Sequence, residues 1–413
     1  MIDDAAVDAL AGERLDWRYK AIPASAQGLT VAEASAARLS LAAFGTPLLT
    51  LDAGALAHNL RTMASWTRDA GLSLAPHGKT TMAPALWRAQ LGAGAWAITL
   101  ANLPQLRVAR AFGVRRVLLA NELLDPAGLA WLGSELEVDP GFEFFCFVDS
   151  LRGVALMDDA LRAARTQRPV HVCVELGGPH ARTGIRDDGD ALDVADAVRK
   201  APTLRLAGIG GYEGALAHDA SGESLRSVDA YLRRLADLHG RLDYETDEPI
   251  VTAGGSSYVD QVAEILGGAP GRAVLRAGSY LVHDDGFYRD ISPFARTGAG
   301  RPLRSAMHGW ARVLSRPEPG LALLDAGRRD LPFDSGLPEP QRVRGGEEPP
   351  GGRITELNDQ HAFLTGAAVE VGDVVRLGLS HPCTALDKWT LIPVVDDADA
   401  QEPTVVDYVR TFF

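Results

Sequence analysis

Residues 250–279 read IVTAGGSSYVDQVAEILGGAPGRAVLRAGS, and this stretch decides the fold. It holds a short apolar run at 250–254, an amphipathic segment at 258–266 and a second apolar run at 273–279. Runs of this length around a helical period predict a strand, a helix and a strand. Because two strands joined by a helical crossover lie parallel, the stretch predicts one unit of a parallel sheet.

The same alternation extends over residues 46–290. The strand candidates are residues 48–51, 72–79, 95–102, 114–121, 142–149, 170–175, 204–212, 250–254 and 273–279. They fit an α/β fold, a (β/α)8 TIM-type barrel with one strand contributed elsewhere, and a doubly wound open sheet is the alternative. We favour the barrel because residues with reactive side chains recur at the C-terminal ends of the strands, where barrel active sites lie.

The composition of the sequence changes after residue 293, where Pro and Gly become frequent. Short apolar runs follow at residues 367–371, 373–379 and 391–395. We therefore predict a barrel over residues 46–293 and a C-terminal antiparallel β-domain over residues 294–413. Residues 1–45 contain no barrel-like strand and are expected to pack on the β-domain.

Composition excludes several classes of protein. The net charge is −13, from 41 basic and 54 acidic residues, which argues against a nucleic-acid partner. No apolar run is long enough to span a bilayer, and the N-terminus does not resemble a signal peptide. Three cysteines indicate a reducing compartment, with Cys146 and Cys173 buried as thiols. We expect a cytoplasmic protein without membrane contact.

The segment Pro76-His77-Gly78-Lys79-Thr80 ends an apolar run on a lysine. A lysine at a strand end would project into a barrel mouth, where its amine can form an imine with an aldehyde cofactor. Position alone favours a simpler interpretation, a surface lysine that starts a loop.

Two glycine-rich loops follow the last two strand candidates, where barrels commonly bind phosphate. Glycine lets backbone N–H groups approach a phosphate closely, and hydroxyl groups add donors. Two ordinary turns are the alternative interpretation. The candidate phosphate-binding residues are Gly254, Gly255, Ser256, Gly278, Ser279 and Tyr280.

Two further strand ends carry polar side chains. Arg182 could donate hydrogen bonds to a phenolic oxygen or a carboxylate, or could pair with Glu175 or Asp187 instead. Tyr212 could contact a cofactor ring, or could be a half-buried barrel tyrosine.

The segment His381-Pro382-Cys383 holds a candidate metal pair. Imidazole and thiolate suit Zn²⁺, and two protein ligands leave positions open for water and substrate. A turn with an incidental cysteine is the alternative. A lysine for imine chemistry together with a metal pair narrows the range of functions.

With these motifs together, the chain resembles the pyridoxal-phosphate enzymes of the alanine racemase fold, in the D-serine dehydratase and D-threonine aldolase branch. Residues 76–80 look like the P-H-x-K-T lysine motif, and Arg182-Thr183-Gly184 resembles the R-x-G motif of the cofactor arginine. His381 and Cys383 resemble the zinc pair of the dehydratases, where the aldolases carry aspartate in the cysteine's position. Ala75 and Thr81 depart from the eukaryotic-type motif, so a bacterial group of D-serine dehydratase-like amino-acid deaminases is more similar.

The resemblance implies pyridoxal 5'-phosphate on Lys79, with His77 nearby, and Zn²⁺ on His381 and Cys383, with Mn²⁺ as the alternative metal. It implies that the first strand, residues 48–51, joins the β-domain, and that the protein is a homodimer. The expected reaction eliminates water from a small D-β-hydroxy amino acid to give a 2-oxo acid and ammonia. A D-threonine-type aldolase and a non-catalytic pyridoxal-phosphate-binding protein are the alternatives.

Overall fold

The computed structural model describes residues 1–179, 181–297, 301–346 and 349–413. The chain forms two compact units. The first consists of residues 1–3, 64–79 and 90–278, and the second of residues 4–63, 80–89 and 279–413. In the described ranges, no helix combines the length and the apolar character that a membrane crossing requires.

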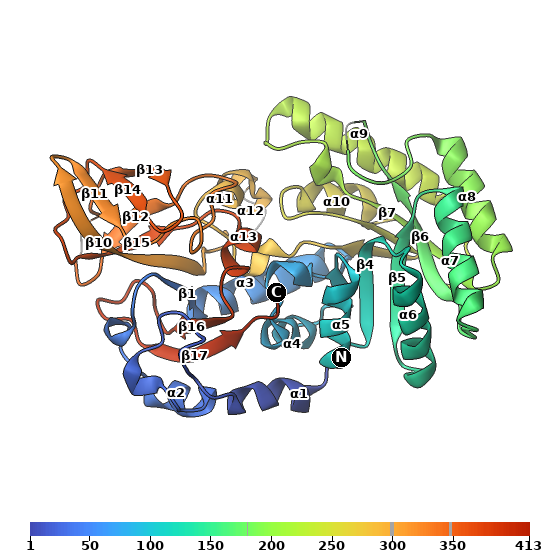
Figure 1. Ribbon diagram of the computed structural model, residues 1–413. Helices are drawn as coiled ribbons and strands as arrows, with labels where there is room; N and C mark the ends of the chain where they lie inside the picture. The colour runs from blue at the N-terminus through green and yellow to red at the C-terminus, as the bar shows by residue number, and fades with distance from the viewer. Residues whose placement is uncertain (180, 298–300, 347–348) are drawn as a thin grey trace. The chain divides into compact units, whose positions relative to one another are not determined.

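The first unit is built on eight parallel strands in the order β2-β9-β8-β7-β6-β5-β4-β3. Figure 1 shows β4, β5, β6 and β7 side by side. Each strand pairs parallel with its neighbour, as expected for strands joined by helical crossovers, and the register shifts once in the β4–β5 pair and once in the β6–β7 pair. The strands are β2 (Ser73–Leu74), β3 (Ile98–Leu100), β4 (Arg116–Glu122), β5 (Glu143–Val148), β6 (Val170–Leu176), β7 (Leu204–Gly211), β8 (Ile250–Ala253) and β9 (Arg272–Leu275).

Backbone hydrogen bonds join the two ends of this sheet. The amide of Trp96 donates to the carbonyl of Leu74 at 2.7 Å, and the amide of Thr99 donates to the carbonyl of Pro76 at 2.9 Å. His77 and Thr99 form a parallel bridge just beyond these bonds. The sheet therefore closes, and the predicted (β/α)8 barrel is confirmed.

The helices of the barrel begin where polar side chains cap them. Asn102, Asp125, Ser150, Asp187 and Ser221 each accept a hydrogen bond from an amide of the first helical turn. The helices that these residues start are α5 (Leu103–Ala111), α6 (Pro126–Val138), α7 (Leu151–Ala163), α8 (Asp188–Lys200) and α9 (Gly222–His239), followed by α10 (Val259–Leu266). Two earlier helices are α3 (Ala53–Asp69) and α4 (Pro84–Gly92).

Apolar side chains from the strands and from the residues beside them form one buried cluster that includes Leu118, Phe145, Phe147 and Cys173. The barrel is thus a packed core rather than a channel. The prediction that Cys146 and Cys173 are buried thiols is confirmed. Burial raises the pKa of Cys173 to about 12 and that of Cys146 well above its usual range, so neither forms a thiolate near neutral pH.

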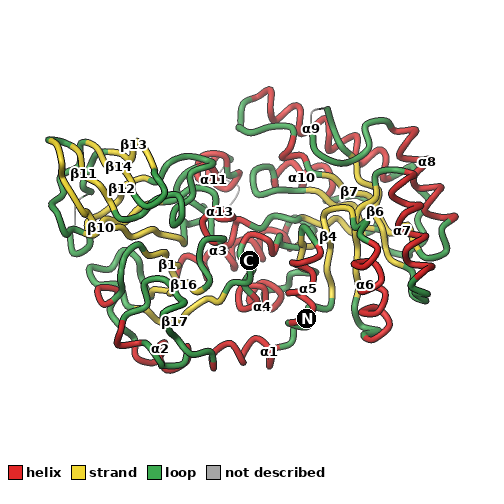
Figure 2. The backbone as a smooth tube through the Cα atoms, viewed as in Figure 1, coloured by secondary structure: helices red, strands yellow, loops and turns green. Residues whose placement is uncertain are grey.

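The second unit contains a nine-stranded, mainly antiparallel sheet, whose strands are yellow in Figure 2. Its strands are β1 (Leu48–Asp52), β10 (Met307–Glu318), β11 (Leu321–Leu324), β12 (Glu339–Val343), β13 (Arg353–Leu357), β14 (Ala362–Thr365), β15 (Val374–Gly378), β16 (Leu391–Val395) and β17 (Val405–Arg410). Its helices are α1 (Asp4–Asp8), α2 (Val31–Ala37), α11 (Phe287–Ile291), α12 (Pro293–Arg296) and α13 (Pro382–Leu386).

Two predictions about this sheet have opposite outcomes. β1 pairs antiparallel with β10 and parallel with β16, so the first strand does leave the barrel, as predicted. A strand over residues 367–371 is wrong. Gly366 adopts φ 72°, β14 ends before it, and the following segment runs into a turn at Gly372, where φ is 100°.

The N-terminal residues share a core with this sheet. Leu15, Val31, Leu41 and Phe44 belong to one buried cluster with side chains of β10, β15, β16 and β17, such as Trp310. Burying aliphatic side chains of this size contributes roughly 1.5–3 kcal/mol each, which is enough to hold a segment with few regular elements of its own.

Two buried histidines make the stability of the second unit dependent on pH. Burial lowers the pKa of His308 to about 3 and that of His283 to about 4, below the value of about 6.5 expected in the unfolded chain. Between these values the unfolded state binds more protons, so stability is present above pH 6.5 and falls as the pH falls. Each histidine contributes a slope of up to about 1.4 kcal/mol per pH unit.

We expect His308→Gln to flatten this slope in urea unfolding at pH 7, 6 and 5. The variant His361→Gln is the control, because His361 is exposed. Equal slopes for the wild type and His308→Gln would contradict the assignment.

Candidate functional site

Lys79 lies in a short 3-10 helix, Gly78–Thr80, immediately after the closure of the barrel. The apolar run that precedes it forms only the two-residue strand β2, because the chain leaves the sheet after His77. Lys79 is therefore carried by a turn at the C-terminal rim rather than by the strand itself. Its side chain is half-buried.

His77 links several of the predicted residues electrostatically. Its Nδ1 atom is shielded from solvent and has no hydrogen-bond partner among the described residues. Burial lowers the pKa of His77 well below its usual range, and the positive charges of Lys79, Arg276 and Arg182 lower it further. The imidazole is therefore neutral, and a cationic neighbourhood of Lys79, Arg182 and Arg276 surrounds it.

Arg182 and Tyr212 come together as a pair. The guanidinium group of Arg182 lies over the ring of Tyr212, 4.7 Å from its centroid, which is cation–π distance. Tyr212 follows the last residue of β7, and Arg182 lies in the loop after β6. Among the described residues Arg182 forms no ion pair with Glu175 or Asp187, and the Asp187 carboxylate caps α8 instead.

Arg276 is a site residue that sequence reasoning passed over. It is 4% exposed and donates to Thr252 Oγ1 at 2.7 Å and to the carbonyl of Gly211 at 2.5 Å. A fully buried cation directly after β9 lies where barrel active sites form. A charged residue beside glycines at a strand end was the signal that could have identified it.

Glu213 is a second residue that was missed, and it bears on the first phosphate loop. Its carboxylate is fully buried and accepts hydrogen bonds from the amides of Gly254 at 2.9 Å and Gly255 at 2.8 Å. Burial raises the pKa of Glu213, while these amides and Arg276 oppose that shift. A phosphate at this loop would have to exchange with Glu213 or take its donors from other groups such as Ser256, which is half-buried.

The second phosphate loop is divided between the two units. Gly278 is the last residue of the first unit. Ser279 and Tyr280 begin the 3-10 helix Ser279–Leu281 in the second unit, where they are 4% and 1% exposed. The phosphate-binding role of all six predicted residues stays a prediction.

The arrangement at the rim fits an anionic aldehyde cofactor such as pyridoxal phosphate. A primary amine, an unpartnered ring nitrogen and two guanidinium groups lie in one electrostatic neighbourhood. A Cβ atom at Gly255 would lie 3.0 Å from the ring of Tyr212, so glycine keeps this backbone close to the ring. Guanidinium groups bind phosphate and phenolate oxygens strongly.

His381 and Cys383 flank the start of α13 in the second unit. His381 has the left-handed φ of 53°, which is uncommon for a residue other than glycine, and Pro382 is the first helical residue. The backbone amide of His381 donates to Asp284 Oδ2 at 2.9 Å. Such backbone conformations occur at functional sites where neighbouring groups enforce them.

The imidazole is held by a carboxylate. His381 Nδ1 lies 2.5 Å from Asp334 Oδ2, and Asp334 Oδ1 accepts a hydrogen bond of 2.6 Å from Thr384. Cys383 and then Asp334 raise the pKa of His381 to about 9, against the opposing effect of burial. Cys383 Sγ lies 3.4 Å from Thr80 Oγ1, and Thr80 follows Lys79 in the chain.

These donors fit a thiophilic divalent metal. Because Asp334 engages Nδ1, Nε2 of His381 is the nitrogen left for coordination. A carboxylate on the other ring nitrogen is the usual support of a metal-binding histidine. The sulfur of Cys383 supplies the soft ligand that favours Zn²⁺ over magnesium or calcium.

Comparisons with known proteins agree with this geometry. Residues 51–284 match the family model described as "Alanine racemase, N-terminal domain", and residues 306–395 match the one described as "Putative serine dehydratase domain". The chain is 29% identical to a D-threonine aldolase of an Arthrobacter species, over 83% of this chain and 86% of that protein.

Solved structures are similar over nearly the whole chain. The D-threonine aldolase from Filomicrobium marinum is 27% identical with a TM-score of 0.76, covering 91% of this chain and 97% of that one. The D-threo-3-hydroxyaspartate dehydratase from Delftia sp. HT23 is 21% identical with a TM-score of 0.71, covering 90% and 99%. At that lower identity the likeness concerns the fold alone.

The carboxylate of Asp334 should control metal binding. We expect Asp334→Asn to lower zinc affinity about 10- to 100-fold, the usual effect of losing the partner of a metal-binding histidine. Competition with a chromogenic chelator measures this affinity. Asp387→Asn is the matched control, because Asp387 is exposed and bonded to Lys388. Unchanged affinity in Asp334→Asn would exclude Asp334 as the support of a metal ligand.

Proposed function

We propose that this chain, which belongs to the alanine racemase N-terminal domain family in the branch of D-serine dehydratases and D-threonine aldolases, eliminates water from a D-β-hydroxy amino acid. The products would be a 2-oxo acid and ammonia. The observation that carries this proposal is the His381–Cys383 pair with Asp334 on the imidazole, in a chain that also has Lys79 at the barrel rim.

Lys79 is the residue proposed to hold the cofactor and to move the proton. Pyridoxal phosphate, when bound there, supplies the electron sink that makes the α-proton of an amino acid acidic. Lys79 Nζ would take that proton as a general base. Arg182 and Arg276 would offset the negative charge of the cofactor, and the neutral imidazole of His77 adds no further positive charge.

His381 and Cys383 would assist the departure of the β-hydroxyl group, because hydroxide is a poor leaving group. A divalent metal on these two residues would supply Lewis acidity. Asp334 keeps the imidazole oriented. The left-handed backbone at His381 sets the direction from which the two ligands leave the chain.

A D-threonine-type aldolase is the second candidate, favoured by the two D-threonine aldolases to which the chain is similar. An aldolase would use the same lysine but break the bond between the α- and β-carbons, which gives glycine and an aldehyde. Cys383 supports elimination, because the sequence resemblance associates cysteine with the dehydratases and aspartate with the aldolases.

Product analysis separates the two candidates. The protein is supplied with pyridoxal phosphate, and D- and L-serine, threonine and 3-hydroxyaspartate are offered with and without a chelator. We expect 2-oxo acid and ammonia from D-forms only, and their loss with the chelator. Glycine and aldehyde would establish the aldolase instead. If neither product forms, the proposed substrate class is wrong.

Substitutions test the metal role of His381 and the cofactor role of Lys79 separately. We expect His381→Ala to lower turnover at least about 100-fold, because loss of even an outer partner of a metal costs up to that factor. The visible absorption of the bound cofactor should persist in His381→Ala and disappear in Lys79→Ala. His361→Ala, an exposed histidine in the same unit, is the control and should keep full activity. Full turnover in His381→Ala would exclude the metal role.

A further inference from the structure

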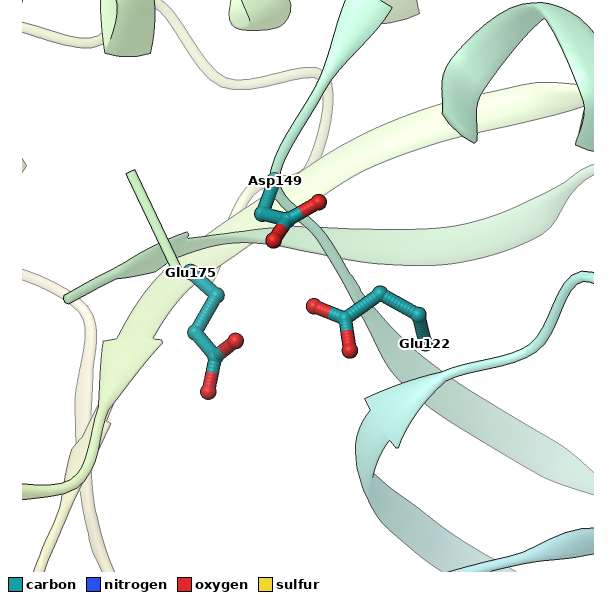
Figure 3. Close-up of side chains that lie close together, drawn as sticks. All are labelled: Glu122, Asp149 and Glu175. Atoms are coloured by element: carbon teal, nitrogen blue, oxygen red, sulfur yellow. The ribbon is translucent and has the colours of Figure 1, made fainter. Parts of the chain in front are cut away.

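Three carboxylates meet at the C-terminal rim of the barrel, apart from the residues discussed so far. Glu122 ends β4, Asp149 directly follows β5 and Glu175 lies near the end of β6. These strands are neighbours in the sheet, and one oxygen of each carboxylate lies within 4.8 Å of the other two. Figure 3 shows the three side chains reaching from their strands towards a common space.

Buried oxygens of this cluster lack partners. Glu175 is 6% exposed, and its Oε2 atom has no hydrogen-bond partner among the described residues. The Oε1 atom of Glu122 is also shielded from solvent and unpartnered in the described part of the chain. Carboxylate oxygens accept hydrogen bonds and do not donate them, so three ionised carboxylates cannot satisfy one another. An unpaired buried charge is strongly unfavourable, so the cluster must take up positive charge, either as a proton between Glu122 and Glu175 or as a cation.

Burial, the negative charge of Glu175 and a side-chain hydrogen bond with Glu175 raise the pKa of Glu122 to about 8, so without a cation Glu122 keeps its proton near neutral pH. This is the effect expected when like charges are brought together without a counterion. A cation bound by the cluster would replace this proton, because both take the same oxygens.

The backbone holds these carboxylates in position before any ligand binds. Asp149 Oδ2 accepts a hydrogen bond of 3.1 Å from the amide of Gly184, which leaves its second oxygen for the cluster. The carbonyl of Glu175 accepts from the amide of Ile185 at 2.8 Å, and the amide of Gly177 donates to the carbonyl of Ile185 at 2.9 Å. The carboxylate of Asp149 and the backbone of Glu175 are thus both bonded to the loop after β6.

We infer that Glu122, Asp149 and Glu175 bind one hard divalent cation, of the class of Mg²⁺, Ca²⁺ or Mn²⁺. Such cations prefer carboxylate oxygens and keep several waters in their coordination shell, which suits a site of three side chains at an open rim. This oxygen-only site differs in chemistry from His381 and Cys383, whose nitrogen and sulfur suit Zn²⁺. The site stands whether or not the proposed reaction is correct.

The cation would also act on a predicted cofactor residue. The loop that Asp149 and Glu175 hold carries Arg182, whose guanidinium group lies over Tyr212. A cation that fixes the carboxylate of Asp149 would steady its hydrogen bond to the amide of Gly184 in this loop. It would therefore position Arg182 without contacting it.

Manganese binding tests the site in the full-length chain carrying pyridoxal phosphate. The variant His381→Ala/Cys383→Ala removes the other candidate metal ligands, and dialysis against a chelator removes bound metal. Titration with Mn²⁺, followed by the electron paramagnetic resonance signal of the free ion, should show one bound equivalent. Absence of bound Mn²⁺ would overturn the inference.

Single substitutions in that background locate the bound ion. We expect Glu175→Gln and Glu122→Gln each to weaken Mn²⁺ binding by at least about 10-fold, the lower range for loss of an outer partner. Glu264→Gln, an exposed glutamate on α10, is the matched control and should bind as before. Circular dichroism and thermal melting check that each variant is folded, and the half-buried position of Glu122 makes its variant the gentler change. Binding that survives both substitutions, or that the control also loses, would place the ion elsewhere and overturn the inference.

Discussion

Closure of the eight-stranded parallel sheet is the constraint on which the rest of the structure depends. It is made by backbone hydrogen bonds from Trp96 and Thr99 to Leu74 and Pro76, reinforced by Thr99 Oγ1, which donates to the carbonyl of Ala75 at 2.6 Å. Because every strand runs in the same direction, closure brings all the C-terminal ends to one rim. The chain must turn sharply where the ring closes, and the short helix that makes this turn carries Lys79.

Because the strand ends meet at one rim, charged side chains of both signs lie close together there. The pKa of His77 reflects burial together with the nearby positive charges of Lys79, Arg276 and Arg182, which keep its imidazole neutral. Around the rim, β4, β5 and β6 present carboxylates instead. The same convergence that assembles a cationic neighbourhood for an anionic cofactor therefore also assembles an anionic one suited to a hard cation.

Much of this could be predicted from the sequence, because the signals are local. The period of the apolar runs predicted the barrel strands, and the pattern around Lys79 identified a candidate reactive lysine. The His-x-Cys spacing identified a candidate metal pair, since two residues separated by one proline stay close along the chain. The predicted strand boundaries were less accurate. Of residues 72–79 only Ser73–Leu74 form a strand, and the chain enters a short 3-10 helix at Gly78. The failed strand at 367–371 shows that apolar runs also occur between two glycine turns.

The sequence by itself determined the fold class, and it supplied the candidate lysine and the candidate metal pair, because each of these signals lies in a few consecutive residues. Only the tertiary structure decided which distant side chains complete them. Asp334 meets His381 from 47 positions away, and Glu213 meets the amides of Gly254 and Gly255 from 41 and 42 positions away. Glu122, Asp149 and Glu175 lie on separate strands and become one cluster at the rim. Contacts between strand ends depend on how the sheet closes and on its register. Neither can be predicted from the spacing of residues along the chain.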